Sequence, residues 1–190
     1  VKVIPGEDRA LKITNKSDLA TATGILLPNT QKQIRVGIGT DAHAFSSDKN
    51  RKLSLAGLIW DGEIGLDGHS DADVASHAIC DALLSAASLG DLGSNFGTSD
   101  AKYAGASGAQ MLSETMTKVK AAGFVIENVS VQIVGNKPKI APRRAEAIAA
   151  ISAALGGAKV SVSATSTDGL GFTGDGKGLS AIATALLVSA

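Results

Sequence analysis

The chain has 190 residues, with 18 basic and 18 acidic side chains, a formal net charge of zero and only 3% aromatic residues. Because it has neither a basic field nor many rings on which bases stack, we expect no nucleic-acid partner and no binding to a membrane. A lone cysteine, Cys80, no apolar run of about 18 residues and a charged start without a signal-peptide core together predict a soluble cytoplasmic protein.

The first 33 residues differ in pattern from the rest of the chain. Residues 1–4 and 11–14 are predicted to form short strands, and Ser17 and Asp18 are predicted to cap a helix that ends at Leu27. A polar linker follows and leads into a main domain over 34–190, which is long enough to bury one sizeable core. The alternative interpretation of the first segment is a tag or a disordered leader.

From residue 34 onward, patterns typical of strands and of helices alternate. The expected strands are 35–39, a hairpin near 52–60, 124–134 and 159–166, and a loop rich in glycine, serine and aspartate covers 93–108. The expected helices are 71–89, 109–122, 141–155 and 178–188. This alternation predicts an α/β (α+β) single domain in which helices pack on one face of a mixed sheet.

Each of the three histidines lies close to an aspartate. His69 and His77 belong to the stretch 68–77, and His43 follows Asp41 by two residues. In an extended segment, residues two apart point to the same side. Neutral imidazole and carboxylate are ordinary ligands of a divalent ion such as zinc. The pattern favours a metal site over the alternative, in which these are solvated polar residues that only cap a helix.

The helix expected over 71–89 would carry one of these ligands. Ser70 is predicted to cap its start and Gly90 to end it. Ser70, Asp73 and His77 fall on one polar stripe, which places His77 over the opening turns, where the other two expected ligands can reach it.

Five separated motifs resemble the 2-C-methyl-D-erythritol 2,4-cyclodiphosphate synthases, lyases of the non-mevalonate (MEP) pathway of isoprenoid biosynthesis. The resemblance covers 34–190 in order and spacing, through RVGIGTDAH (35–43), GHSDADVASH (68–77), DALL and LGDLG (81–93), NKPK (136–139) and ATSTDGLGFTG (164–174). It implies that the 2-phosphate of 4-diphosphocytidyl-2-C-methyl-D-erythritol 2-phosphate attacks its own β-phosphate, so that CMP leaves and the cyclic diphosphate closes. It also implies a homotrimer with active sites between neighbouring subunits.

The same resemblance implies a role for each matching residue. Asp41, His43 and His77 would hold Zn²⁺ or a similar divalent metal, and Mg²⁺ or Mn²⁺ would accompany the substrate diphosphate. The implied catalytic residues are Asp168, His69 and Thr167, and the implied substrate contacts are Ser70, Asp91, Gly93, Phe172 and Lys177. The implied nucleotide-binding residues are Gly135, Pro138, Lys139, Ile140, Ala141, Thr165 and Ser166.

Simpler interpretations remain open for several of these positions. Asp91 lies between glycines and is also typical of a turn, 165–167 is also typical of a strand edge, and 135–140 is also typical of a surface turn. The family usually has an arginine followed by Gly-Glu-Gly after 172–174, whereas this chain has Asp175 and then Lys177. We expect Lys177 to supply the positive charge from the other side of the turn, although a lysine lacks the bidentate fork of an arginine.

Two other functions are therefore considered. A catalytically weak trimer that binds isoprenoid diphosphates would keep the metal ligands, and the altered turn at 175–177 favours it. A metal-dependent phosphohydrolase ranks last, because it needs an activated water and no spare general base is evident beside the expected ligands.

The N-terminal segment carries a second resemblance. Residues 6–14, GEDRALKIT, followed by SDLA at 17–20, are similar to the C-terminal end of 2-C-methyl-D-erythritol 4-phosphate cytidylyltransferase. The resemblance spans 1–27 and implies that 1–33 is the tail and linker of a cytidylyltransferase domain, covalently fused to the synthase domain in a bifunctional enzyme.

Overall fold

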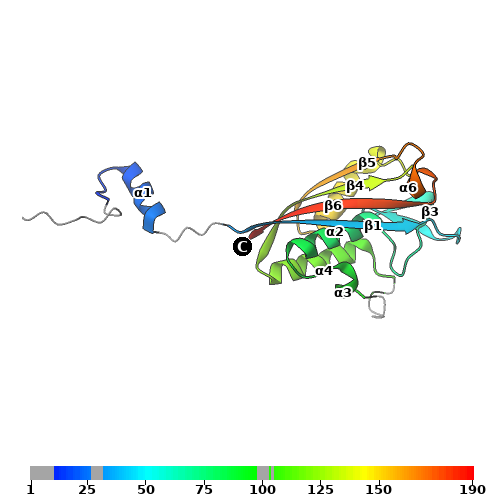
Figure 1. The fold of residues 1–190 in the computed structure, drawn as a ribbon, viewed down its shortest axis with the longest axis horizontal. Coiled ribbons are helices and arrows are strands. Elements are labelled where there is room, and N and C mark those ends of the chain that lie inside the picture. The colour runs from blue at the N-terminus through cyan, green and yellow to red at the C-terminus, as the bar shows by residue number, and fades with distance from the viewer. Residues whose placement is uncertain (1–10, 27–31, 98–102, 104) are drawn as a thin grey trace, which may run out of the picture. The chain divides into compact units, whose positions relative to one another are not determined.

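The computed structural model describes residues 11–26, 32–97, 103 and 105–190, and the chain divides into two compact units, Val1–Gln33 and Ile34–Ala190 (Figure 1). The strand predicted at 1–4 and the first five residues of the cytidylyltransferase-like motif, 6–10, lie outside the described residues. Within the described ranges, each helix falls short of the length and apolar character that a bilayer crossing requires.

The N-terminal unit contains the helix α1 (Lys16–Leu26). The strand predicted at 11–14 is wrong, since these residues have no strand pairing. The predicted cap is also wrong, because the side chain of Asn15 accepts the N–H groups of Ser17 and Asp18 at 2.9 and 3.0 Å. Asp18 in turn accepts the N–H of Asn15 at 3.1 Å, so the two side chains close the start of the helix reciprocally.

The second unit is built on a four-stranded mixed sheet with the order β1-β6-β4-β5. Its strands are β1 (Ile34–Ala44), β4 (Phe124–Val134), β5 (Lys159–Thr165) and β6 (Gly178–Ser189). Strand β6 is antiparallel to β1 and β4, and β4 is parallel to β5. His43 is paired with Leu179, and Val134 with both Ser180 and Thr165. The last residues of β1, β4 and β5 therefore meet at one end of the sheet, beside the start of β6.

Helices cover one face of this sheet, which confirms the predicted fold class. Helix α2 packs on β1 and β6, with α4 beside it (Figure 1), and α5 packs on β5 beside α4. The helices are α2 (Val74–Ala86), α3 (Leu92–Asn95), α4 (Gly108–Ala121), α5 (Arg144–Ala154) and α6 (Gly171–Gly174), with a 3₁₀ turn η2 (Ala141–Arg143) before α5. A separate hairpin of β2 (Lys52–Leu55) and β3 (Leu58–Ile64) confirms the hairpin predicted near 52–60.

Two glycines let α2 lie directly on β1. A Cβ atom at Gly37 would lie 2.0 Å from the carbonyl oxygen of Ala82, and one at Gly39 would lie 2.1 Å from that of Ala78. No side chain fits at either position, so these odd-numbered residues of β1 face the helix. Because alternate residues of a strand share a face, Asp41 and His43 also point toward α2.

The helix predicted at 178–188 is wrong, because this segment is the strand β6. Its buried residues alternate along the chain and are Leu179, Ala181, Ala183, Ala185 and Leu187. Alanine favours a helix intrinsically, yet this period of two suits a strand that is hydrogen-bonded on both sides. The alanines that face α2 are small, and this allows the helix to pack closely against the sheet.

Helix α2 begins later than predicted. Its N-cap is Asp73 rather than Ser70, and Asp73 accepts the N–H groups of Ala75 and Ser76, each at 3.1 Å. The helix ends at Ala86, and Ser88 rather than Gly90 takes the first left-handed conformation beyond it, with φ of 58°.

The carboxylate of Asp73 is fully buried and also holds the hairpin against the helix. It accepts the N–H of Ala56 at 2.8 Å and that of Gly57 at 2.7 Å, both from the turn between β2 and β3. The hydroxyl of Ser76 donates to the same carboxylate at 2.7 Å. With the two cap contacts, five donors meet on one side chain, so the hairpin and the start of α2 are fixed together.

We therefore expect Asp73→Asn to lower the free energy of unfolding by about 3 kcal/mol, because an amide NH₂ would face donors that are buried. Asp61→Asn is the control, since Asp61 is exposed on β3 and its replacement should change stability by less than about 0.5 kcal/mol. Urea denaturation of the three proteins measures both effects. A loss below about 1 kcal/mol in Asp73→Asn would show that this carboxylate does not hold the two elements together.

Candidate active site

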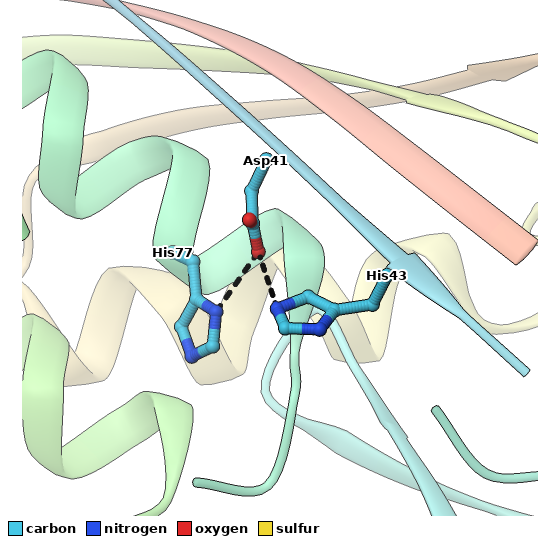
Figure 2. A group of neighbouring side chains, drawn as sticks. All are labelled: Asp41, His43 and His77. Carbon is cyan, nitrogen blue, oxygen red and sulfur yellow. Dashed lines mark hydrogen bonds and ion pairs between the residues drawn. The ribbon is translucent and has the colours of Figure 1, made fainter. Parts of the chain in front are cut away.

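The three predicted metal ligands come together where β1 meets α2. The Oδ2 atom of Asp41 lies 2.9 Å from Nδ1 of His77 and 3.2 Å from Nε2 of His43 (Figure 2). One ligand atom from each residue lies within 4.8 Å of the others. His77 is buried, and the other two are partly buried. The alternative interpretation, solvated polar residues at a helix cap, does not fit this burial.

The second nitrogen of each imidazole is held by the loop at 67–70. Nδ1 of His43 contacts the carbonyl oxygen of Asp67, and Nε2 of His77 lies 3.1 Å from the hydroxyl of Ser70. When Nδ1–H of His43 donates to that carbonyl, its Nε2 is left with a lone pair toward Asp41. Outer contacts of this kind orient the histidine ligands of metal sites.

The electrostatics of the site keep Asp41 ionised, which suits a cation beside it. Burial would raise the pKa of Asp41, but hydrogen bonds with His43 and His77 outweigh it and hold that pKa below its ordinary value. The hydrogen bond to Asp41 raises the pKa of His43 in turn, although burial opposes this shift. One carboxylate and two imidazoles, each with an outer partner, fit a divalent metal such as zinc.

A cavity of about 210 Å³ opens beside the triad. Its lining includes His43, His69, Ser70 and His77, all predicted as site residues, together with Gly68. Leu92, Phe96, Tyr103 and Met111 also line it, and we call these four residues the apolar wall.

The two aromatic residues of the apolar wall were missed from the sequence, because they come from a segment interpreted as a polar loop. Phe96 and Tyr103 pack edge to face, with ring centroids 5.0 Å apart. Two rings in a polar segment of a chain with 3% aromatics were the signal that could have predicted this wall.

A second cavity, of about 220 Å³, brings together all seven residues predicted to bind the nucleotide. Five come from the segment after β4 and two from the end of β5, namely Gly135, Pro138, Lys139, Ile140, Ala141, Thr165 and Ser166. Arg144, at the start of α5, also lines it and was not predicted. Both strands end at the same end of the sheet as β1, and the last residues of β1 include the ligand His43.

Further predicted residues lie between β5 and β6. Asp168 is exposed, has φ of 52°, and accepts a hydrogen bond from the hydroxyl of Ser166 at 2.9 Å. The hydroxyl of Thr167 donates to the carbonyl of Leu170 at 2.6 Å, so it helps to shape the loop. Phe172 is 45% exposed in α6.

Lys177 and Asp91 make local contacts of their own. Lys177 forms an ion pair with Asp175 at 2.9 Å. Asp91 caps α3 and accepts the N–H of Ser94 at 2.7 Å, and Gly93 lies within that helix. The contact agrees with the simpler interpretation of Asp91 as a turn residue, and its substrate role stays a prediction.

Comparisons with known proteins place these features in a family context. The sequence profile of the YgbB family matches residues 34–188. A bifunctional enzyme IspD/IspF from Clavibacter michiganensis is 51% identical over 192 residues, an alignment that covers 98% of this chain and 46% of that protein. The chain thus spans about half the length of that relative.

Shorter relatives match over nearly their whole length. A 2-C-methyl-D-erythritol 2,4-cyclodiphosphate synthase from Acidothermus cellulolyticus is 51% identical over 168 residues, which cover 88% of this chain and 99% of that protein. Among solved structures, IspF from Plasmodium falciparum in complex with CDP has a TM-score of 0.70 and 28% identity, and the match covers 82% of this chain and 96% of that one.

The shifts at Asp41 and His43 predict how stability depends on pH when the protein is stripped of metal. Because the pKa of His43 is raised in the folded protein, this side chain adds to the free energy of unfolding below pH 6.5, its ordinary pKa. That contribution is lost as the pH rises through the pKa of the folded state. The lowered pKa of Asp41 gives stability that is present above 3.8 and is lost as pH falls through the folded value. The pair should therefore stabilise most between pH 3.8 and 6.5.

We expect the difference in unfolding free energy between the parent and His43→Ala to peak in this window, at about 1 kcal/mol. Urea denaturation in the presence of a chelator, repeated from acid to alkaline pH, measures it. With excess zinc the trend should reverse, because protonation of imidazole competes with metal in acid. A pH-independent difference in the chelated protein would refute the assigned pKa shifts.

Proposed function

This chain belongs to the YgbB family, and on that premise we propose that residues 34–190 form a 2-C-methyl-D-erythritol 2,4-cyclodiphosphate synthase, a lyase of the MEP pathway. The observation that carries the proposal is the Asp41, His43 and His77 cluster beside a partly apolar cavity. Relatives that are 51% identical carry this enzyme's name. The reaction converts 4-diphosphocytidyl-2-C-methyl-D-erythritol 2-phosphate into the cyclic diphosphate and CMP.

We assign Zn²⁺ to Asp41, His43 and His77, whose donor atoms suit it. A divalent cation held there supplies electrostatic stabilisation to a phosphoryl oxygen on which charge develops. The anionic Asp41 and the orientation of both imidazoles keep the site ready for that cation. We assign the contact with the 2-phosphate to His69, which is exposed and lines the cavity.

The apolar wall favours cyclisation of the substrate over its hydrolysis. Leu92, Phe96 and Met111 offer carbon surface to the methylerythritol chain in the cavity that the histidines also line. A bound chain that covers this wall displaces water and folds the 2-phosphate back toward the β-phosphate, which favours attack within the same molecule. This wall argues against a phosphohydrolase.

The second cavity is assigned to the cytidine nucleotide. Its predicted residues surround a hollow at the end of β4 and β5, and a relative with known structure is a CDP complex. Asp168 follows this cavity directly in sequence and presents an exposed carboxylate, so we assign it to a second ion, Mg²⁺ or Mn²⁺, on the diphosphate. Phosphoryl transfer needs this positioning and charge neutralisation more than covalent chemistry.

A weaker, diphosphate-binding trimer is the second candidate function, and the Asp175–Lys177 ion pair favours it. Because Lys177 is already paired at 2.9 Å, its charge is partly neutralised before a phosphate arrives. A substrate phosphate must compete with Asp175 for the same ammonium group.

We assign residues 1–33 to the tail and linker of a fused cytidylyltransferase domain. The match to the Clavibacter bifunctional enzyme covers 98% of this chain, whereas the family profile begins at residue 34. The short segment before residue 34 thus has a counterpart in a two-enzyme polypeptide.

We also assign a homotrimer to the synthase domain, on the basis of the sheet face opposite the helices. The even-numbered residues Ile34, Val36 and Ile38 of β1 are 63% to 71% exposed, and Ile182 of β6 is 45% exposed. A row of exposed branched side chains on adjacent strands favours burial against other subunits. The trimer implied by the family covers this face.

Light scattering should therefore give three times the mass of the chain. Ile38→Lys places a charge in the proposed interface and should shift the mass toward the monomer, whereas Glu127→Lys, exposed on β4 but polar already, should not. A parent protein that is monomeric at micromolar concentration would defeat the assignment.

Phosphorus NMR of the protein with its cytidyl substrate tests the activity directly. We expect CMP and the cyclic diphosphate in equal amounts, and a turnover reduced by about a hundredfold or more in His77→Ala, because charge stabilisation at the reacting phosphate is lost. Retained far-ultraviolet circular dichroism would show that the variant is folded. A linear bisphosphate product would instead identify a phosphohydrolase, and binding without turnover would identify the diphosphate-binding trimer.

A further inference from the structure

Both histidine ligands are held from outside by a single loop. Asp67 offers its carbonyl to Nδ1 of His43, and Ser70 offers its hydroxyl to Nε2 of His77. Gly68 lies so close to His43 that a Cβ there would be 3.1 Å from the ring atom Cε1 and 3.3 Å from Nδ1. The position of this loop, 67–70, therefore decides where both rings point.

Arg51 holds that loop through its main chain. Its Nη2 atom donates to the carbonyl of Gly68 at 2.9 Å and to the carbonyl of Ser70 at 2.7 Å. The two carbonyls flank His69, so one guanidinium group fixes both ends of the central peptide of the loop. A planar, rigid donor group makes two such contacts at lower entropic cost than an ammonium group on a flexible stem.

The main chain of Arg51 is itself anchored at the start of the hairpin. Its N–H donates to the carbonyl of Asp48 and its carbonyl accepts the N–H of Gly65, both at 3.1 Å. A Cβ at Gly65 would lie 2.5 Å from the same carbonyl, so the two segments are in close contact. The side chain of Arg51, which is partly buried, thus extends toward the loop from a fixed base.

We propose that Arg51 is a positioning residue for the metal centre, which holds the loop 67–70 so that Asp67 and Ser70 orient the ring nitrogens of His43 and His77 toward one cation. This inference rests on the metal centre of the proposed function but does not depend on the reaction catalysed there. Its direct consequence is a higher affinity for a divalent metal and a defined ligand geometry.

Cobalt binding tests the proposal without any turnover measurement. Co²⁺ added to metal-free protein reports ligand geometry by its visible absorption spectrum, and competition with a chelator gives the affinity for Co²⁺ and for Zn²⁺. Arg51→Met keeps the apolar stem and removes the donors, so we expect an affinity about 10- to 100-fold lower and an altered Co²⁺ spectrum. Arg51→Lys should fall between this variant and the parent.

Arg143→Met is the matched control. Arg143 also donates to a main-chain carbonyl of the hairpin segment, that of Ile59 at 2.7 Å, and packs over Trp60. Its loss removes a comparable contact without touching the loop 67–70, so stability should fall while metal affinity and the Co²⁺ spectrum stay unchanged.

Ser70→Ala keeps the proposal testable if Arg51→Met does not fold. This variant removes only the hydroxyl beside His77 and should lower metal affinity by about tenfold. If Arg51 acts through the loop, adding Arg51→Lys to Ser70→Ala should cost less affinity than it costs in the parent.

Unchanged affinity and an unchanged Co²⁺ spectrum in folded Arg51→Met, or in Ser70→Ala, would overturn this inference and leave the metal centre standing. A parent protein that binds no Co²⁺ would overturn both. A parent that binds the metal but lacks cyclase activity would refute the proposed function alone.

Discussion

The close packing of α2 on β1 is the constraint on which the site depends. Carbonyl oxygens of the helix lie where side chains would stand at Gly37 and Gly39, so the two backbones nearly touch. This approach sets the distance from Asp41, two residues further along the strand, to His77 on the first turns of the helix. A larger side chain at either glycine would push the helix outward and separate the ligands, because packed interiors do not absorb extra atoms without displacement. The approach of the three candidate ligands to one another is thus a consequence of backbone packing.

A second set of contacts orients the ligands that this packing brings together. The buried Asp73 carboxylate fixes the start of α2 to the hairpin, and Arg51, directly before the same hairpin, holds the loop that orients the two rings. The hairpin carries no ligand itself, yet this region supports the ligands through two sets of contacts, one to the start of α2 and one to the loop 67–70. Sites of this kind lose affinity when the supporting contacts are removed, even though every ligand remains.

The ligand triad was predictable from the sequence because its chemistry is local. Asp41 and His43 sit two apart on a strand, and His77 lies on a helix whose pattern is clear. The strand β6 was not predictable, because its alanines favour a helix and only its partners on both sides decide otherwise. Ser70 was assigned to a helix cap, whereas its hydroxyl faces His77, since Asp73 offers the better-placed carboxylate. The apolar wall of the cavity depends on a loop whose fold no periodicity encodes.

The proposed site holds one divalent metal between β1 and α2. Anomalous diffraction from crystals of the protein grown with zinc, with data on both sides of the zinc absorption edge, tests it most directly. We expect one anomalous peak per chain within about 2.3 Å of a carboxylate oxygen of Asp41, Nε2 of His43 and Nδ1 of His77. A peak at other residues, or no peak at this cluster while zinc is bound elsewhere, would contradict it.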